Sequence, residues 1–453
     1  MEMSSLFVVG LVFTAGSFLI FLIVYLNRRQ SRSSSDAQSI STHYSEDDQQ
    51  KNGSTAKSGG GKGKGGKTRL HSQSGPQQFE HSWLASTLKG HSRSILDLDF
   101  SSNGKHLITC GEDRSLLLWN TNDFDQKEHK SVKGNMELDH AKYVRFAPDS
   151  KSILICLAFS NTLTVYKMIK KEGGGGGVKI QPIEGVEFPV AHKFDIINIG
   201  ISCNGKFVMS ASGDTTVIVW DLKGNILKTM DTRLGNNNYA AVSPCGRFVA
   251  ASGFTPDVKV WEVGFGKNGD FQDVTRAFEL KGHASGIYSF DFNQDSTRMV
   301  TASKDGTFRV WDTNIRYQLG QEAYLIATGS LDEMRQHRAL VCMSPSGDSA
   351  AIACHRSIRV YGADAASEEG RIEDAHGNEL ISGLKFSVDG RYLVSVGDKI
   401  ARVFHNVAGY RAQARRAKDQ LKSAQGEALK ERLTDQLRQA DEICRRLTGK
   451  PAL

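Results

Sequence analysis

The chain has 453 residues, 39% of them hydrophobic and 24% charged, which is the balance of a globular protein and too apolar for a wholly disordered one. Seven cysteines, an odd number with no Cys-x-x-Cys spacing, argue against a disulfide framework and indicate a reducing compartment. The net charge of +7 lies mainly in two tails: residues 27–78 hold nine Lys/Arg against four Asp/Glu, and residues 411–450 hold eleven against six. The central part is therefore close to neutral, and any basic binding surface belongs to the tails.

The first predicted element is a membrane anchor. The segment from Leu6 to Leu26 has twenty-one residues without a charge, enough for a helix to span a hydrocarbon core of roughly 30 Å. A cleaved signal peptide is the alternative, but no basic segment precedes the apolar run and no Ala-x-Ala site follows it. Glu2 precedes the run and arginines follow it, so the positive-inside rule places everything after it in the cytosol. We therefore predict an N-terminal transmembrane anchor over residues 1–26.

Residues 27–78 are predicted to form a disordered basic Gly/Ser/Lys linker, because they contain almost no large apolar side chains. Residues 61–68 match the phosphate-binding loop pattern, but the strand and helix that this chemistry requires are missing, so we attribute the match to low complexity. Asn52 begins a glycosylation sequon that only a luminal linker could use, so it tests the predicted topology.

From Trp83 onward the chain repeats one unit. Its most regular copy, residues 280–313, opens with Gly282-His283, closes with Trp311-Asp312 and contains three runs of alternating apolar residues. The seven copies end at Trp119, Tyr166, Trp220, Trp261, Trp311, Tyr361 and Phe404. A repeat of this kind is the signature of WD40 blades, so we predict an all-β fold with a seven-bladed WD40 β-propeller over residues 79–406. The strand from Trp83 to Leu88 should pair with the last blade and close the ring.

Polar residues recur within the repeats at positions that can form a buried relay of hydrogen bonds. A histidine at the repeat start, a Thr or Ser, an Asp from a turn and a closing Trp should bond to one another. Three blades carry the whole set: His91, Thr109, Asp113 and Trp119; His192, Ser210, Asp214 and Trp220; and His283, Thr301, Asp305 and Trp311. We therefore expect these histidines to have a structural role and not a metal-binding or catalytic one.

No catalytic, cofactor-binding or metal-binding motif occurs in the sequence, so none of these sites is predicted and an enzyme is disfavoured. Charged residues on exposed turns are candidate partner contacts: Arg93, Glu112, Lys304 and Arg356. Insertions enlarge four connections, at residues 170–177, 253–257, 264–272 and 317–335, where specific contacts are often found.

Residues 407–453 are predicted to form a C-terminal amphipathic charged helix, or two, because the apolar stripe shifts beside Gly426. Four roles remain open at this point. The helix could pack against the propeller wall, bind a helical partner, lie on an anionic membrane surface or contact an RNA backbone.

Four runs are too idiosyncratic for generic repeats: ELDHAKYVRFAPD from Glu137, AAVSPCGRFVA from Ala240, GFTPDVKVWEV from Gly253 and AFELKGH from Ala277. With the anchor, basic stalk, propeller and helical tail, they resemble the transducin beta-like family of membrane-anchored WD40-repeat proteins. The resemblance implies a single-pass endoplasmic reticulum protein with its propeller in the cytosol and no known catalytic activity. It also implies association with the stress-sensing translation-factor kinase of that membrane, with ribosomes and with mRNA, in the unfolded protein response.

The leading hypothesis is a non-enzymatic, membrane-anchored scaffold that binds protein partners on a face or rim of the propeller, without a small-molecule substrate. The second is an RNA- or ribosome-associated factor that acts through its basic tails. The third, an enzyme, would require a pocket that brings titratable groups together.

Overall fold

The computed structural model describes residues 79–170 and 177–453. The predicted anchor, the predicted linker with Asn52, and residues 171–176 of the first insertion lie outside these ranges. Within the described ranges, no helix combines the length and the apolar character that crossing a bilayer requires.

The described chain forms seven four-stranded antiparallel sheets, and the first three follow directly along the chain. Blade one consists of β2 (Ile95–Phe100), β3 (His106–Gly111), β4 (Ser115–Asn120) and β5 (Ser131–Asn135). Blade two consists of β6 (Ala141–Phe146), β7 (Ser152–Leu157), β8 (Leu163–Lys170) and β9 (Val178–Pro182). Blade three consists of β10 (Ile196–Ile201), β11 (Val208–Ser212), β12 (Thr216–Trp220) and β13 (Ile226–Asp231).

The next three blades repeat this order of strands. Blade four consists of β14 (Asn237–Val242), β15 (Phe248–Gly253), β16 (Val258–Phe265) and β17 (Phe271–Leu280). Blade five consists of β18 (Ile287–Phe292), β19 (Arg298–Ser303), β20 (Thr307–Asp312) and β21 (Tyr324–Ser330). Blade six consists of β22 (Ala339–Met343), β23 (Ser349–Cys354), β24 (Ser357–Gly362) and β25 (Ser367–Ile372).

Blade seven joins the two ends of the propeller. It consists of β26 (Gly383–Phe386), β27 (Tyr392–Val396), β28 (Ile400–His405) and the first strand of the described chain, β1 (Leu84–Lys89). β1 pairs with β28 in antiparallel register, with Thr87 opposite Arg402. The predicted closure is therefore confirmed.

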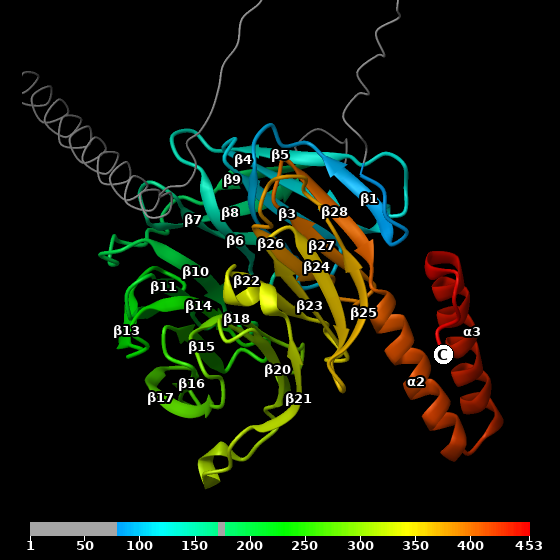
Figure 1. The fold of residues 1–453 in the computed structure, drawn as a ribbon. Coiled ribbons are helices and arrows are strands. Elements are labelled where there is room, and N and C mark those ends of the chain that lie inside the picture. Colours follow the sequence, from blue (N-terminus) through cyan, green and yellow to red (C-terminus); the bar gives the residue numbers. More distant parts are fainter. Residues whose placement is uncertain (1–78, 171–176) are drawn as a thin grey trace, which may run out of the picture. The chain divides into compact units, whose positions relative to one another are not determined.

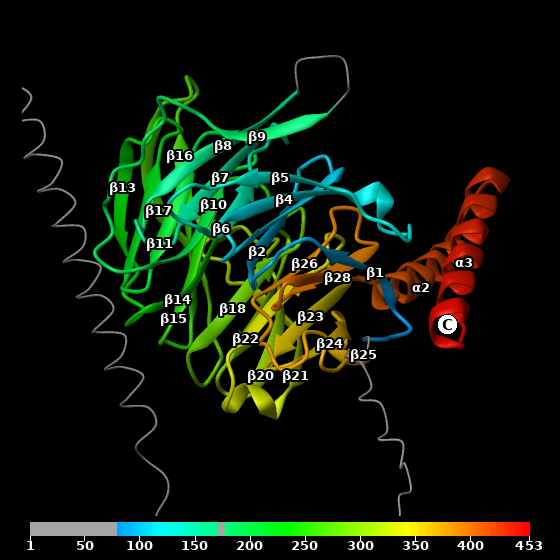
Figure 2. The same ribbon diagram turned by 90° about the horizontal axis from the view of Figure 1, so that it is seen from above.

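The sheets surround a common axis (Figures 1 and 2). The innermost strand of each blade contacts that of the next, and β26 contacts β2, so the ring is complete. One cluster of buried apolar residues fills each junction between neighbouring blades; between blades one and two, for example, Ile108 packs with Val144 and Ile155. A single blade could not bury these faces alone, which explains why the repeats form one unit.

Two helices follow the propeller: α2 (Val407–Ser423) and α3 (Glu427–Thr448). They are separated beside Gly426, which has a φ of 96°, so the alternative of two helices is the correct one. Asn406 caps α2 by accepting a hydrogen bond from the Gly409 amide.

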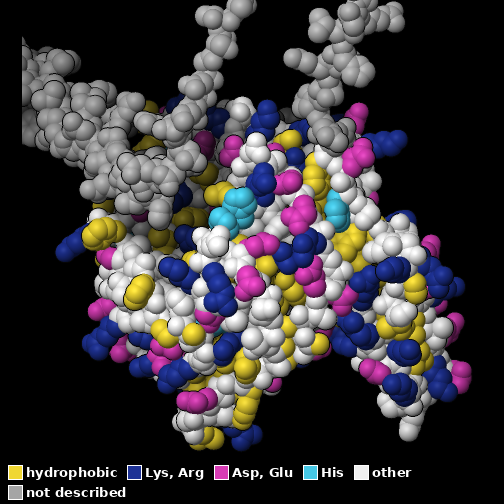
Figure 3. Space-filling model, viewed as in Figure 1, with side chains coloured by type: hydrophobic (Ala, Val, Ile, Leu, Met, Phe, Trp, Pro, Cys, Tyr) yellow, Lys and Arg dark blue, Asp and Glu magenta, His cyan; other side chains and the backbone are white. Residues whose placement is uncertain are grey.

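α2 packs against blade six, where it contacts β23, β24 and β25. Glu369 accepts hydrogen bonds from Arg411 at 2.7 Å and Arg415 at 3.1 Å, and Arg416 pairs with Asp348. Lys and Arg side chains cover much of the visible surface of α2 and α3, interspersed with Asp and Glu (Figure 3). Of the four roles left open by the sequence, the structure shows packing against the propeller wall.

Candidate protein-binding face

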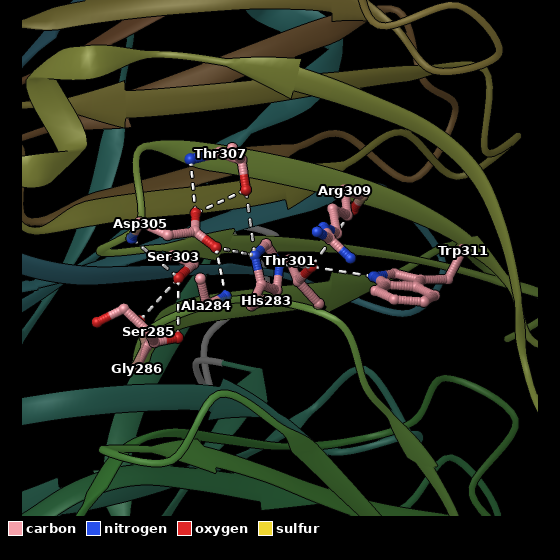
Figure 4. A network of polar contacts seen from close by, with 10 residues as sticks. All are labelled: His283, Ala284, Ser285, Gly286, Thr301, Ser303, Asp305, Thr307, Arg309 and Trp311. Atoms are coloured by element: carbon pink, nitrogen blue, oxygen red, sulfur yellow. Dashed lines mark hydrogen bonds and ion pairs between the residues drawn. The ribbon is translucent and has the colours of Figure 1, made fainter.

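Blade five contains a complete polar relay (Figure 4). Trp311 Nε1 lies 3.0 Å from Thr301 Oγ1, which lies 2.8 Å from His283 Nε2. His283 Nδ1 lies 2.9 Å from Asp305 Oδ2. The chain of donors runs from the indole N–H through the threonine hydroxyl to a neutral imidazole, whose Nδ1–H donates to the carboxylate.

The electrostatics of this relay agree with its geometry. Burial lowers the pKa of His283 below its ordinary value, although Asp305 acts in the opposite direction. Burial also opposes ionisation of Asp305, but hydrogen bonds from Thr307, the Ala284 amide and His283 outweigh it and lower the pKa of Asp305 to about 2. The relay therefore holds a buried neutral histidine whose two ring nitrogens are both hydrogen-bonded, which satisfies buried polar groups and fits the predicted structural role.

Blade one has the same arrangement, and blade three has part of it. In blade one, His91 lies 2.8 Å from Thr109 Oγ1 and 3.0 Å from Asp113, and Trp119 Nε1 lies 3.1 Å from Thr109.

In blade three, Ser210 binds His192 at 2.6 Å and Trp220 at 2.8 Å. However, His192 Nδ1 has no hydrogen-bond partner, so Asp214 does not complete this relay.

Sequence reasoning missed a fourth relay, in blade seven. His376 lies 2.8 Å from both Ser395 Oγ and Asp398 Oδ1. Arg402 contributes a further contact, with Nη1 3.1 Å from Asp398. This relay was not predicted because Phe404 and not Trp occupies the closing position. A signal was present, since the spacing of 22 residues from His to Asp equals that of blades one and five.

The relay aspartates also tie two sets of loops together on one side of the ring. The Ser92 amide donates to Asp113 at 2.8 Å, and the Ala284 amide donates to Asp305 at 2.9 Å. Each bond joins the loop before an innermost strand to the turn between the second and third strands of the same blade. We call the side formed by these loops and turns the relay face, and the other side the opposite face.

The four predicted contact residues all lie in connections of the relay face. Arg93, Glu112 and Lys304 are exposed, whereas Arg356 is half-buried. Arg356 donates to Asn378 at 3.1 Å and pairs with Asp374 at 3.3 Å, so it also orders its own turn. The four residues are distributed over three blades.

The relay face also exposes large apolar side chains. Sequence reasoning missed all of them except Phe254, which lies in the insertion at residues 253–257. Six of them lie in its loops and turns, with exposed fractions between 49% and 91%: Leu138, Phe159, Val190, Phe194, Phe254 and Leu380. Five of the six belong to blades two, three and four. A signal was present, since apolar residues at turn positions such as those of the GFTPD run have no role in the repeat.

A cavity of about 700 Å³ follows the axis and is lined by the innermost strands. It brings titratable groups together, which the enzyme hypothesis required. However, Asp97 accepts a hydrogen bond from the Val144 amide at 3.0 Å and Asp291 from the Met343 amide at 2.9 Å. Burial raises the pKa of Asp291 to about 6. These carboxylates join adjacent blades, which accounts for their positions without catalysis.

Metal binding finds no support in the part of the chain that the structure describes, where no group of three or more His, Cys, Asp or Glu residues could hold an ion.

Comparison with known proteins identifies the family. The model of the WD domain, G-beta repeat, matches residues 82–120, 186–221, 275–312 and 369–405. Human transducin beta-like protein 2 is 48% identical over 375 residues, which cover 82% of this chain and 83% of the human protein. The chain belongs to the transducin beta-like protein 2 family. The mouse protein of that name is 47% identical over 82% of this chain and 84% of its own length. Nuclear distribution protein PAC1 of Arthroderma otae is 23% identical over 51% of this chain and 52% of its own length.

The four matched repeats are blades one, three, five and seven, which are the blades with a histidine in the relay. Blades two, four and six depart from the repeat model although each forms a four-stranded sheet. WD40 propellers of this kind are typically non-enzymatic scaffolds that bind proteins. The features particular to this transducin beta-like protein 2 relative should therefore be sought in the blades that depart from the repeat.

Proposed function

We propose that the protein is a non-enzymatic, membrane-anchored scaffold that binds a protein partner through the relay face of its propeller. We place it at the cytosolic face of the endoplasmic reticulum, in the unfolded protein response and translational control under stress. The observation that carries the proposed binding mode is the set of six exposed apolar side chains on one face. Exposed apolar side chains among charged neighbours are typical of sites for partner proteins.

Neighbouring blades hold these apolar residues in fixed positions. Asn161 in blade two donates to the Phe194 carbonyl at 2.9 Å and accepts from the Ile196 amide at 2.8 Å, which joins the turn of Phe159 to the loop of Phe194. The Phe254 side chain lies against Gly235. A rigid surface loses little conformational entropy on binding, which favours an anchoring role for these side chains.

A pair of charge-introducing variants tests the binding face. Phe194→Asp combined with Phe254→Asp should abolish proximity labelling of the partner by an enzyme fused to the C-terminus. The matched control, Leu319→Asp with Tyr324→Asp, changes two residues of the opposite face that are 77% and 56% exposed. The control should leave labelling unchanged. Equal labelling by both double variants would contradict the proposed face.

The proposed membrane location is supported by the uncharged segment from Leu6 to Leu26 and by what the sequence resemblance implies. Deleting this segment should release the protein from membranes. If Asn52 carries an endoglycosidase-sensitive glycan in cells, the linker is luminal and the cytosolic scaffold is wrong. The proposed partners, an endoplasmic reticulum stress-sensor kinase and the ribosome, should appear among the labelled proteins only while the anchor is present.

The second candidate is an RNA-associated factor that uses its basic tails. The ion pairs of α2 disfavour this role for the C-terminal tail, because Arg411, Arg415 and Arg416 are paired with carboxylates of the propeller. The remaining charges of the helices are mostly paired along the helices themselves, as between Arg438 and Asp435 at 2.9 Å.

A further inference from the structure

Two cysteines occupy adjacent turns on the opposite face, between the first and second strands of blades three and four. Cys203 lies between β10 and β11, and Cys245 lies between β14 and β15. Cys203 is exposed and Cys245 is partly exposed, whereas the other five cysteines are buried. The scaffold function does not use this pair.

Two hydroxyl groups lie beside Cys245. Ser243 Oγ lies 3.2 Å from Cys245 Sγ, and Ser296 Oγ of blade five accepts a hydrogen bond from the Cys245 amide at 3.0 Å. Burial alone would raise the pKa of Cys245, but hydrogen bonds from Ser243, Ser296 and Arg247 outweigh it and lower the pKa below its ordinary value. A partly exposed thiol with such hydrogen bonds ionises more readily than a free cysteine, and the thiolate is its reactive form.

Cys203 lies directly against the turn of Cys245. A Cβ atom on Gly246 would lie 2.8 Å from Cys203 Sγ and 3.2 Å from the Cys203 backbone nitrogen, so only glycine fits beside it. Asn204 Nδ2 also donates to the Gly246 carbonyl at 3.2 Å, which holds the two turns together. Partial burial raises the pKa of Cys203, and the neighbouring Cys245 thiol adds to this effect. These contacts place the two cysteines on neighbouring turns of the opposite face.

We propose that Cys245 is a peroxide-reactive thiol and that Cys203 resolves its oxidised form into a disulfide that joins blades three and four. The Cys245 thiolate attacks one oxygen of hydrogen peroxide, the O–O bond breaks, and the product is a sulfenic acid with hydroxide leaving as water. Cys203 then attacks the sulfenic sulfur, an S–S bond forms and the S–O bond breaks to release a second water. Overall, the two thiols lose two electrons and become one disulfide, and one hydrogen peroxide is reduced to two waters.

Peptide mapping without reduction tests the pair in the full-length protein. After treatment with hydrogen peroxide, trypsin should release residues 194–206 cross-linked to residues 234–247, and a thiol reductant should separate them. In Cys203→Ser, dimedone should trap a sulfenic acid on Cys245. In Cys245→Ser, dimedone should label Cys203 about tenfold less than it labels Cys245 in Cys203→Ser, because exposure alone does not activate a thiol. The buried Cys110 serves as an internal control and should stay unlabelled.

Ser296→Ala tests the role of the donors, because it should move the pH at which Cys245 becomes reactive upward while the midpoint of urea unfolding changes little. Two results would overturn the proposal. One is the absence of the cross-linked peptide from peroxide-treated protein that remains folded. The other is equal dimedone labelling of Cys203 and Cys245 in the two serine variants, which would mean that exposure alone decides reactivity.

Discussion

Replacing Thr301 with valine tests whether the relay stabilises the propeller. Valine keeps the branched shape of threonine but removes the hydroxyl that binds both Trp311 Nε1 at 3.0 Å and His283 Nε2 at 2.8 Å. Thr301 is fully buried, so no water can replace the lost partner. Each unsatisfied buried polar group costs about 1–3 kcal/mol, and we expect Thr301→Val to lower the free energy of unfolding by about 2–4 kcal/mol in total.

The assay is urea unfolding of the full-length protein, followed by tryptophan fluorescence. The midpoint should fall while the dependence on urea stays the same. The control is Thr275→Val on β17, the same chemical change at an exposed position, which should alter stability by less than about 0.5 kcal/mol. In a double-mutant cycle, Trp311→Phe should couple to Thr301→Val by about 1 kcal/mol or more. If the two valine variants unfold at the same urea concentration, the relay does not contribute to stability.

Three further predictions concern the helices, pH and salt. Glu369→Gln should weaken docking of α2 by about 1–3 kcal/mol, because Arg411 and Arg415 lose the carboxylate that they share. Amide hydrogen exchange in α2 should then become faster. The control, Asp419→Asn, removes an exposed ion pair and should leave the exchange unchanged. Burial lowers the pKa of the relay histidines, so stability measured by urea unfolding should fall as pH drops below about 6.5, by up to about 1.4 kcal/mol per pH unit for each histidine. The hydrogen-bonded carboxylates Asp113 and Asp305, whose pKa values are lowered to about 2, should add a second loss as pH falls from about 4 towards 2. Partner retention should weaken by about tenfold or less when salt rises from 50 to 200 mM, whereas six or more phosphate contacts would weaken it by about a thousandfold.

The number of blades and the closure of the ring could be predicted because both depend on a repeated local pattern. Alternating apolar residues recur in each copy, the spacing from His to Trp recurs in three of them, and the strand before the first copy had no other partner. Docking of α2 could not be predicted, because Glu369 and Arg411 are 42 residues apart and neither belongs to a motif. Amphipathic periodicity shows that a helix has an apolar face but does not show which surface covers it.

The relays show a similar limit at the level of single side chains. Asp214 has the spacing of its counterparts and, like Asp305, accepts a hydrogen bond from the amide two residues later, yet it does not reach His192. Sequence spacing fixes the turn on which a carboxylate lies but not the direction in which it points. Conversely, His376 and Asp398 form a relay in a blade whose closing residue is not tryptophan.

Five of the six exposed apolar residues of the relay face lie in blades whose relay is absent or incomplete, and the sixth, Leu380, lies in blade seven, whose relay is formed. In blades one and five, an aspartate in the turn between the second and third strands accepts a hydrogen bond from the loop before the innermost strand. This bond holds the loop and the turn together.

In blade two the direction is reversed: Asp139 of the loop accepts from the Phe159 and Ser160 amides at 2.9 Å, which leaves the Phe159 side chain at the surface. Blade three lacks the aspartate bond and exposes Phe194, and blade four has no relay histidine and exposes Phe254. Loops without the aspartate bond keep large apolar side chains partly exposed, and this is the reason for proposing blades two to four as the site of partner recognition.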